Sequence, residues 1–217
     1  MGEHPDRVFI IGSPELDTHK ANKDISFADV LAYYEILWED FGVFIFHSVT
    51  SELKDLKEQL VNIFTALKRT KKNFVIIAPN NDPGSEMIFK EINKLPSERF
   101  KVIPSMRFSY FSILLKNAKL LVGNSSAGVR EAPFLGTPSI NIGSRQKNRA
   151  FSKSVTNYSY QNDASLDKLI EKKWGNKHLS DKSFGSGNSS KKFIKILDQK
   201  KVWSLKTQKT FFEKPKS

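Results

Sequence analysis

The sequence contains no cysteine, few histidines and no long hydrophobic run. Without cysteine, disulfide bonds and thiolate metal sites are excluded, and the composition is compatible with a reducing cytoplasm, where we expect the protein to work. The histidines are His4, His19, His47 and His178. Their wide spacing does not match that of a metal site, so we expect no metal, and nothing else in the sequence indicates a cofactor.

Signals for a membrane are also missing. The start of the chain, MGEHPDRVFI, is charged and has no apolar stretch before a small-residue cleavage site, so it does not resemble a signal peptide. The apolar runs are far shorter than the roughly 20 residues that a membrane helix needs. These features predict a soluble protein with no membrane partner.

Positive charge is what the sequence has in excess, because 35 Lys and Arg residues face 23 Asp and Glu residues and give a formal net charge of +12. Such a charge is one mark of nucleic-acid binding. Much of the excess is lysine in late segments such as EKKWGNK and SSKKFIK, whereas proteins that read bases interleave arginine with aromatic side chains. We therefore favour a solvated lysine-rich surface that attracts small anions, with no nucleic-acid partner.

The middle of the chain alternates short apolar runs with amphipathic segments. The pattern predicts strands at 41–46, 74–78, 101–103, 120–123 and 139–142, and helices at 50–67, 86–94, 108–117 and 127–135. Apolar strands between amphipathic helices are typical of a parallel sheet that is covered on both faces. With right-handed crossovers, this order predicts an α/β fold with a Rossmann-like, doubly wound parallel sheet.

The two ends of the chain depart from this pattern. Residues 7–12 (RVFIIG) predict an isolated strand, and residues 25–38 predict a helix with one apolar side. From Phe151 onward the sequence is more polar, with helices expected at 165–174 and 188–199. The ends therefore belong to a different part of the architecture from the predicted sheet.

Polar residues follow the predicted strands at their carboxyl ends, which is where open α/β sheets bind ligands. After the strand at 120–123, Ser125 and Ser126 open a helix and offer N–H and O–H donors to a phosphate, and Glu131 can accept hydrogen bonds from a ribose diol. The alternative is that one serine caps the helix and that Glu131 is a solvated surface residue.

Three other loops carry candidate ligand contacts. His47 follows the strand at 41–46 and can donate to a diphosphate or protonate a leaving phosphate. Asn80 lies in the turn PNNDPGS, and Arg145, in GSRQKNR, can neutralise a phosphate with two hydrogen bonds. Each has an ordinary alternative, namely a structural histidine, a common turn composition and a surface loop.

Together these segments resemble one family. The stretch LLVGNSSAGVREAPFLGTPSINIGSRQKNR resembles the nucleotide-binding core of the UDP-N-acetylglucosamine 2-epimerases, and it is most similar to the hydrolysing, sialic-acid-pathway type. HSVTSE resembles that family's HPVTTE, DRVFIIGSPELD its interdomain linker, and SFGSGNSSKKFIKIL its late YGDGNSS-type segment. Ser48 stands where the family usually has proline, and Ser186 replaces an acidic residue.

The resemblance implies the carboxy-terminal half of a glycosyltransferase-B-like enzyme with two Rossmann-like domains. Residues 1–40 would be a remnant of the first domain and the linker, residues 41–185 the UDP-binding domain, and residues 186–217 a C-terminal helix and basic tail. The family's first domain, which carries the carboxylates proposed for proton transfer, has no counterpart in the sequence. We therefore expect a truncated form whose partner is the missing domain, while a homo-oligomer stays open.

The resemblance also gives seven residues a role, one catalytic and six in substrate binding. They are His47, beside the leaving oxygen, and Asn80, Arg107, Ser125, Ser126, Glu131 and Arg145 around the nucleotide sugar. The serines would hold the diphosphate, the glutamate the ribose, and Arg107 would lie near the uracil. The implied substrate is UDP-N-acetylglucosamine or a related UDP-sugar. The alternatives are a non-catalytic UDP-sugar-binding remnant and, less favoured, a basic nucleic-acid-binding protein.

Overall fold

The computed structural model of the chain describes residues 2–21, 24–160, 165–208 and 212. The chain divides into two compact units, one formed by residues 22–181 and the other by its two ends, residues 1–21 and 182–217. Every predicted site residue belongs to the unit at 22–181. No helix of the described residues has both the length and the apolar composition needed to cross a membrane.

A parallel six-stranded sheet forms the centre of the unit at 22–181, with the strand order β3-β2-β1-β4-β5-β6. The strands are β1 (Gly42–Ile45), β2 (Phe74–Ile77), β3 (Phe100–Ile103), β4 (Leu121–Gly123), β5 (Ser139–Ile142) and β6 (Val155–Tyr158). From β1 the chain adds strands toward one edge of the sheet, and from β4 it adds strands toward the other edge. The boundary between β1 and β4 is therefore the switch point of a doubly wound sheet. The predicted Rossmann-like fold is confirmed.

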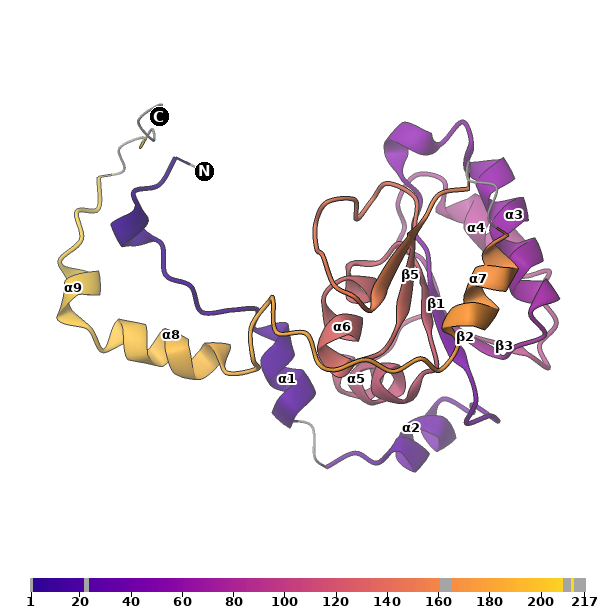
Figure 1. Cartoon of the computed structure of the whole chain (residues 1–217), viewed down its shortest axis with the longest axis horizontal. Helices are drawn as coiled ribbons and strands as arrows, with labels where there is room; N and C mark the ends of the chain where they lie inside the picture. The colour runs from indigo at the N-terminus through magenta and orange to yellow at the C-terminus, as the bar shows by residue number, and fades with distance from the viewer. Residues whose placement is uncertain (1, 22–23, 161–164, 209–211, 213–217) are drawn as a thin grey trace. The chain divides into compact units, whose positions relative to one another are not determined.

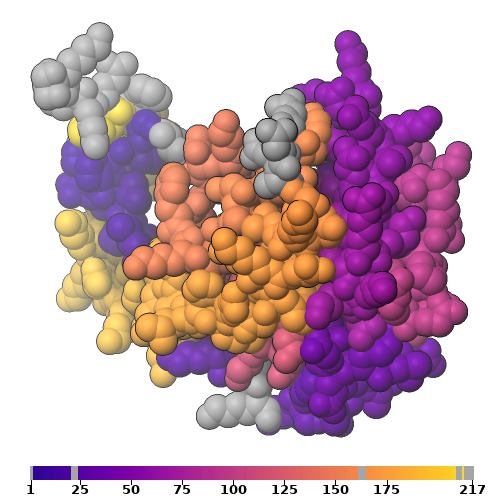
Figure 2. Space-filling model, turned by 45° about the vertical axis from the view of Figure 1, so that its right-hand side comes forward, coloured from indigo at the N-terminus to yellow at the C-terminus, as the bar shows by residue number. Residues whose placement is uncertain are grey.

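Two layers of helices cover the two faces of this sheet (Figure 1). One layer consists of α3 (Leu56–Arg69), α4 (Ser85–Ile92) and α7 (Leu166–Lys173), and the other of α2 (Phe27–Tyr33), α5 (Phe108–Asn117) and α6 (Glu131–Leu135). Along β1, Phe44 packs toward the first layer, while Val43 and Ile45 pack toward the second. All four residues of β1 are buried, as expected for a central parallel strand. In Figure 2 the orange surface that includes α7 lies beside the purple surface of α3.

Two predicted helices begin differently in the structure. The helix predicted from Thr50 is wrong in its first turn, because Thr50–Glu52 is a 3-10 turn and α3 begins only at Leu56. The single helix predicted over 127–135 is also wrong. The chain forms a 3-10 turn at Ser126–Gly128 and restarts as α6, which puts Pro133 in a first helical turn, where its missing N–H costs nothing.

The strand predictions failed at two places. The isolated strand predicted at 7–12 is wrong, because Pro5–Arg7 forms a 3-10 turn and residues 8–12 are not part of any strand. Conversely, β6 was not predicted. β6 is an edge strand with a neighbouring strand on one side only, and its side chains are partly or fully exposed. Its sequence, VTNY, therefore combines polar and apolar residues and lacks the apolar run of a buried strand.

The unit formed by the chain ends contains α1 (Glu15–Ala21), α8 (Ser189–Leu197) and α9 (Lys200–Trp203). Asp17 on α1 accepts hydrogen bonds from the backbone N–H groups of Ser189 and Ser190, both at 2.8 Å, and so caps the start of α8. These bonds, led by that from Ser190, lower the pKa of Asp17 to about 2. The segments GSPELD and GSGNSS are therefore two parts of one structure.

Candidate functional site

A cavity of about 280 Å³ opens at the carboxyl edge of the sheet, where β1 and β4 are neighbours. Five of the seven predicted site residues line it, namely His47, Asn80, Ser125, Ser126 and Glu131. They come from the segments that follow β1, β2 and β4, including the first residue of α6, and the parallel sheet brings these segments to one edge. Met106, Phe108 and Phe111 give the cavity an apolar wall. We call it the switch-point cavity.

The close approach of β4 to β1 depends on Gly123. Its φ of 141° lies in a region that favours glycine, and a Cβ atom there would lie 1.9 Å from the carbonyl oxygen of Ile45. That same carbonyl accepts the backbone N–H of Asn124 at 3.0 Å. Only glycine lets the two strand ends meet at this distance.

Asn124 then fixes the backbone of His47. Its Oδ1 accepts the N–H of His47 at 2.8 Å, and its Nδ2 donates to the carbonyl of His47 at 2.7 Å. The asparagine is 1% exposed, so these bonds are shielded from competing water. The pair sets the direction in which the His47 side chain leaves β1.

The imidazole of His47 is held as a neutral donor. The backbone N–H of Asn80 points to Nδ1 at 3.4 Å, which leaves the ring proton on Nε2. Burial lowers the pKa of His47 below its ordinary value, Arg145 lowers it further, and Asp82 offsets part of the change. Near neutral pH the ring therefore offers an Nε2–H group without carrying a charge.

The loop after β5 brings Arg145 close to this site without placing it in the lining of the cavity. Arg145 Nη1 and Gln146 Nε2 both donate to the carbonyl of Asn124, at 3.2 and 3.1 Å. The influence of Arg145 on the pKa of His47 shows that its charge is felt there. A guanidinium group beside a neutral N–H donor is an arrangement suited to an anion.

The turn after β4 performs the capping role that the sequence left open. Ser125 Oγ accepts the N–H of Ala127 at 3.3 Å, and its own O–H proton still makes it a donor. Ser126 begins the 3-10 turn, and Glu131 begins α6 with only 7% of its surface exposed. Glu131 is thus a buried carboxylate on the cavity wall and not the solvated surface residue of the alternative interpretation.

Arg107 lies differently from the other candidates. Its neighbours Met106 and Phe108 line the switch-point cavity, whereas the Arg107 guanidinium lies 5.9 Å from the ring centre of Tyr33. Its backbone N–H donates to the hydroxyl of Tyr34 at 3.3 Å. The role of Arg107 near a uracil stays a prediction. In the part of the chain that the structure describes, no three His, Asp or Glu side chains gather as a metal site would require.

Two of the residues that organise the site were absent from the predicted set. In the sequence, Asn124 and Gln146 occur only within the stretch LLVGNSSAGVREAPFLGTPSINIGSRQKNR that carries the family resemblance, and neither has a predicted role. Both act through hydrogen bonds between loops that are far apart in the sequence. A polar residue at a predicted strand end was the only signal that could have indicated Asn124.

Comparison with known proteins identifies the family. The model described as UDP-N-acetylglucosamine 2-epimerase matches residues 1–198. The chain belongs to this family. Among curated relatives of this epimerase-family chain, the "UDP-N-acetylglucosamine 2-epimerase" of Neisseria meningitidis serogroup B is 38% identical over 98% of the chain and 57% of the relative. The "UDP-N,N'-diacetylbacillosamine 2-epimerase (hydrolyzing)" of Legionella pneumophila is 28% identical over 91% of the chain and 53% of the relative.

A solved structure shares the fold. The UDP-GlcNAc 2-epimerase of Methanocaldococcus jannaschii, in complex with UDP-GlcNAc and UDP, superimposes with a TM-score of 0.69 at 20% identity. The superposition covers 90% of this chain and 56% of that protein. The epimerase-family chain thus spans about half the length of the curated relatives and solved structures that it matches.

Proposed function

We propose that this chain binds UDP-N-acetylglucosamine or a related UDP-sugar in the switch-point cavity, and that it forms the nucleotide-binding half of a 2-epimerase. The observation that carries the proposal is the meeting of His47, Ser125, Ser126 and Glu131 in one cavity at the switch point of the sheet. Membership of the epimerase family supports the choice of ligand.

Each part of the ligand has a matching group. The hydroxyls of Ser125 and Ser126, the Nε2–H of His47 and the positive charge of Arg145 suit the two phosphates. The buried carboxylate of Glu131 suits the ribose diol, because hydroxyl groups donate strongly to carboxylates. The apolar wall that contains Phe108 suits the flat face of a uracil.

We further infer that the complete enzyme is of the hydrolysing type. In that reaction a base removes the proton at sugar C2, the C1–O bond breaks, and UDP leaves with the bonding electrons. Water then adds at C1 and a proton at C2, which gives N-acetylmannosamine. The role of this chain is to stabilise the charge that grows on the departing UDP, with His47 and Arg145 as fixed donors. The name of the Legionella relative, which includes "hydrolyzing", supports this outcome.

A non-catalytic UDP-sugar-binding protein is the second candidate. One observation favours it, namely that no described residue in the lining of the switch-point cavity is assigned as the base for C2. Among the described residues that line this cavity, the one carboxylate is that of Glu131, which is assigned to the ribose, so we expect a base for C2 from another domain. That domain can belong to the same polypeptide or to a separate subunit.

Calorimetric titration with UDP tests the proposal. We expect saturable binding by the parent chain, and a loss of about tenfold or more for Arg145→Ala and for the double change of Ser125 and Ser126 to alanine, because hydrogen bonds to charged groups contribute about 1.5–3 kcal/mol. Arg99→Ala removes a half-buried arginine that directly precedes β3, and as the matched control it should bind like the parent. Parent-like affinity in both site variants would place the UDP site elsewhere.

A further inference from the structure

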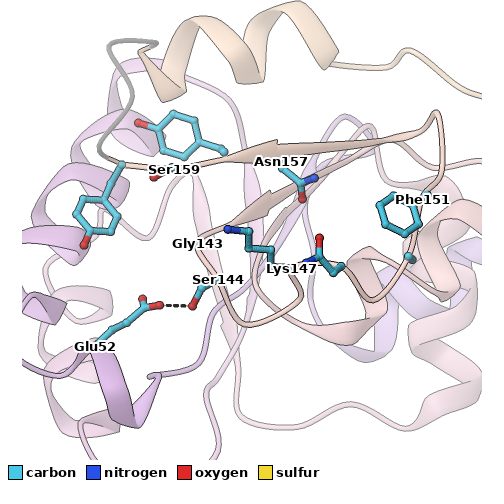
Figure 3. Close-up of a pocket in the computed structure, with 11 residues that line it drawn as sticks. Glu52, Gly143, Ser144, Lys147, Phe151, Asn157 and Ser159 are labelled. Atoms are coloured by element: carbon cyan, nitrogen blue, oxygen red, sulfur yellow. Dashed lines mark hydrogen bonds between the residues drawn. The ribbon is translucent and has the colours of Figure 1, made fainter. Parts of the chain in front are cut away.

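A second cavity, of about 530 Å³, lies beside the carboxyl ends of β5 and β6 (Figure 3). Its lining comes from Glu52, from the loop between β5 and β6, and from the end of β6, and none of it is shared with the switch-point cavity. Glu52 and Phe151 lie at opposite ends, with Lys147 and Asn157 between them (Figure 3). Its volume falls within the range of about 300–1,000 Å³ that is common for small-molecule sites.

The loop after β5 serves the two cavities with different residues. Arg145 and Gln146 donate to the carbonyl of Asn124 near the switch-point cavity, whereas Ser144 and Lys147 line the second one. Gly143 makes this possible with a φ of 73°, which turns the chain sharply after β5. The second cavity is therefore close to the proposed chemistry but has its own set of side chains.

The carboxylate of Glu52 is held in a fixed position. One of its oxygens accepts the hydroxyl of Ser144, drawn as a dashed line in Figure 3, and the other accepts Gln59 Nε2 at 3.1 Å. Carboxylate oxygens have further lone pairs, so Glu52 can still accept from a ligand. Nearby, Asn157 accepts from Asn141 Nδ2 at 2.9 Å through its own oxygen, and its NH₂ group supplies donors.

The charge and the apolar surface of the lining narrow the class of ligand. Among the described residues that line the second cavity, Glu52 and Lys147 are the two that carry a charge at neutral pH, and their charges are opposite. Phe151 exposes 86% of its surface at one end of the cavity, and Tyr158 and Tyr160 add aromatic surface. Donors, acceptors and aromatic faces without net charge suit an uncharged, polyhydroxylated ring better than a phosphate.

We propose that the second cavity binds a neutral amino-sugar ring, and that its natural occupant is the free N-acetylhexosamine released by the reaction. The identity of the occupant rests on the proposed function. Glu52 and Asn157 bond to the hydroxyl and acetamido groups, while Phe151 covers the apolar face of the ring. Product sugar and UDP then occupy separate cavities, so both can be bound at once.

Ligand-observed NMR and calorimetry with N-acetylmannosamine, at saturating UDP, test this site. The expected result is saturable sugar binding that UDP does not displace. Phe151→Ala and Asn157→Ala should each weaken the sugar by about fivefold, as expected for the loss of one ring contact or one hydrogen bond, and leave UDP affinity unchanged. Phe193→Ala, which removes a phenylalanine that is 50% exposed on α8, is the control and should change neither affinity.

Three outcomes would overturn the inference. They are the absence of saturable sugar binding, displacement of the sugar by UDP, and equal affinity in the Phe151 and Phe193 variants. Tighter binding of N-acetylmannosamine 6-phosphate than of the neutral sugar would also contradict the charge argument.

UDP binding without sugar binding would overturn this site alone and leave the proposed function standing. Sugar binding without UDP binding would overturn the proposed function, and with it the identity of the occupant.

Discussion

The side chain of Asn124 reaches from the end of β4 to the end of β1 and bonds both backbone polar groups of His47. Only a primary amide supplies a donor and an acceptor at this spacing without carrying a charge. An aspartate would still accept the N–H of His47 but would place a carboxylate oxygen against its carbonyl. The position of the proposed catalytic histidine is therefore set by a residue that need not touch the ligand.

We predict that Asn124→Ala weakens UDP binding about tenfold, because it leaves a buried N–H and a buried carbonyl of His47 without partners, at about 1–3 kcal/mol each. The imidazole ¹⁵N shifts and the pKa of His47, followed by NMR, should change as well. Asn117→Ala removes an asparagine that bonds within α5 and serves as the control. An unchanged imidazole spectrum in the Asn124 variant would show that the amide pair does not orient the ring.

Glu131 gives a second prediction at this scale. Glu131→Ala should weaken UDP by about 1–3 kcal/mol and should leave pyrophosphate nearly unaffected, because only UDP carries the ribose hydroxyls that the carboxylate is proposed to hold. Calorimetry with both ligands is the measurement, and Glu131→Gln checks that the fold tolerates a change at this buried position. Equal losses for the two ligands would remove Glu131 from the ribose.

The site residues could be predicted from the sequence where they follow the end of a predicted strand. His47, Asn80, Ser125 and Glu131 could be named because polar residues after apolar strands of a parallel sheet meet at one edge. The direction of the Arg107 side chain could not be named, since it depends on Tyr33 in a helix far away in the sequence. The same holds for Asn124, whose partner lies 77 residues earlier.

At the scale of elements, the prediction was good where burial dictates the residue types. α5 and β5 have the predicted bounds, because both pack inside the unit and the apolar residues of each have the spacing expected for its secondary structure. Two features were not predicted. β6 lies at the edge of the sheet and has a neighbouring strand on one side only. The helix before α6 is interrupted, and the restart places Pro133 in a first helical turn. The hydrophobic pattern of a segment indicates which of its residues are buried, but it does not indicate which strands or helices lie beside it.

The cap that α1 provides for α8 leads to a prediction for the unit formed by the chain ends. Asp17→Ala should destabilise α8 by about 0.5–2 kcal/mol, as loss of a helix cap does elsewhere. Hydrogen exchange at Ser189 and Ser190 measures the effect, because their N–H groups lose their acceptor. Asp24→Ala, an exposed aspartate outside this unit, is the control.

The stabilisation that Asp17 gives to α8 should depend on pH. The folded-state pKa of Asp17, about 2, lies below its ordinary value of 3.8, so the bonded carboxylate stabilises the unit above about pH 4. This contribution is lost as the pH falls from 4 toward 2, because the carboxylate then gains a proton. Protection of the two serine amides should fall over that interval in the parent chain and should be independent of pH there in Asp17→Ala.

At the scale of the whole molecule, we propose that the chain supplies the part of the reaction that concerns the departing UDP. The switch-point cavity offers hydrogen-bond donors for a departing diphosphate, and the positive charge of Arg145 lies close to it. Burial and Arg145 lower the pKa of His47, which is a neutral donor in the lining. Proton abstraction at C2 requires a positioned base as well as a closed, water-poor site. Relatives that are nearly twice as long have room for a second domain to supply both.

We therefore predict that the purified 217-residue chain does not convert UDP-N-acetylglucosamine into N-acetylmannosamine and UDP at an appreciable rate. A positioned base typically contributes about 10²–10⁴-fold to a rate, and domain closure adds to this. The assay is UDP release by the chain alone and after addition of the first half of the meningococcal relative, with His47→Ala as the control for a rate that depends on this half. Robust turnover by the chain alone would show that His47 or Glu131 acts as the base, and the two-domain account of catalysis would be wrong.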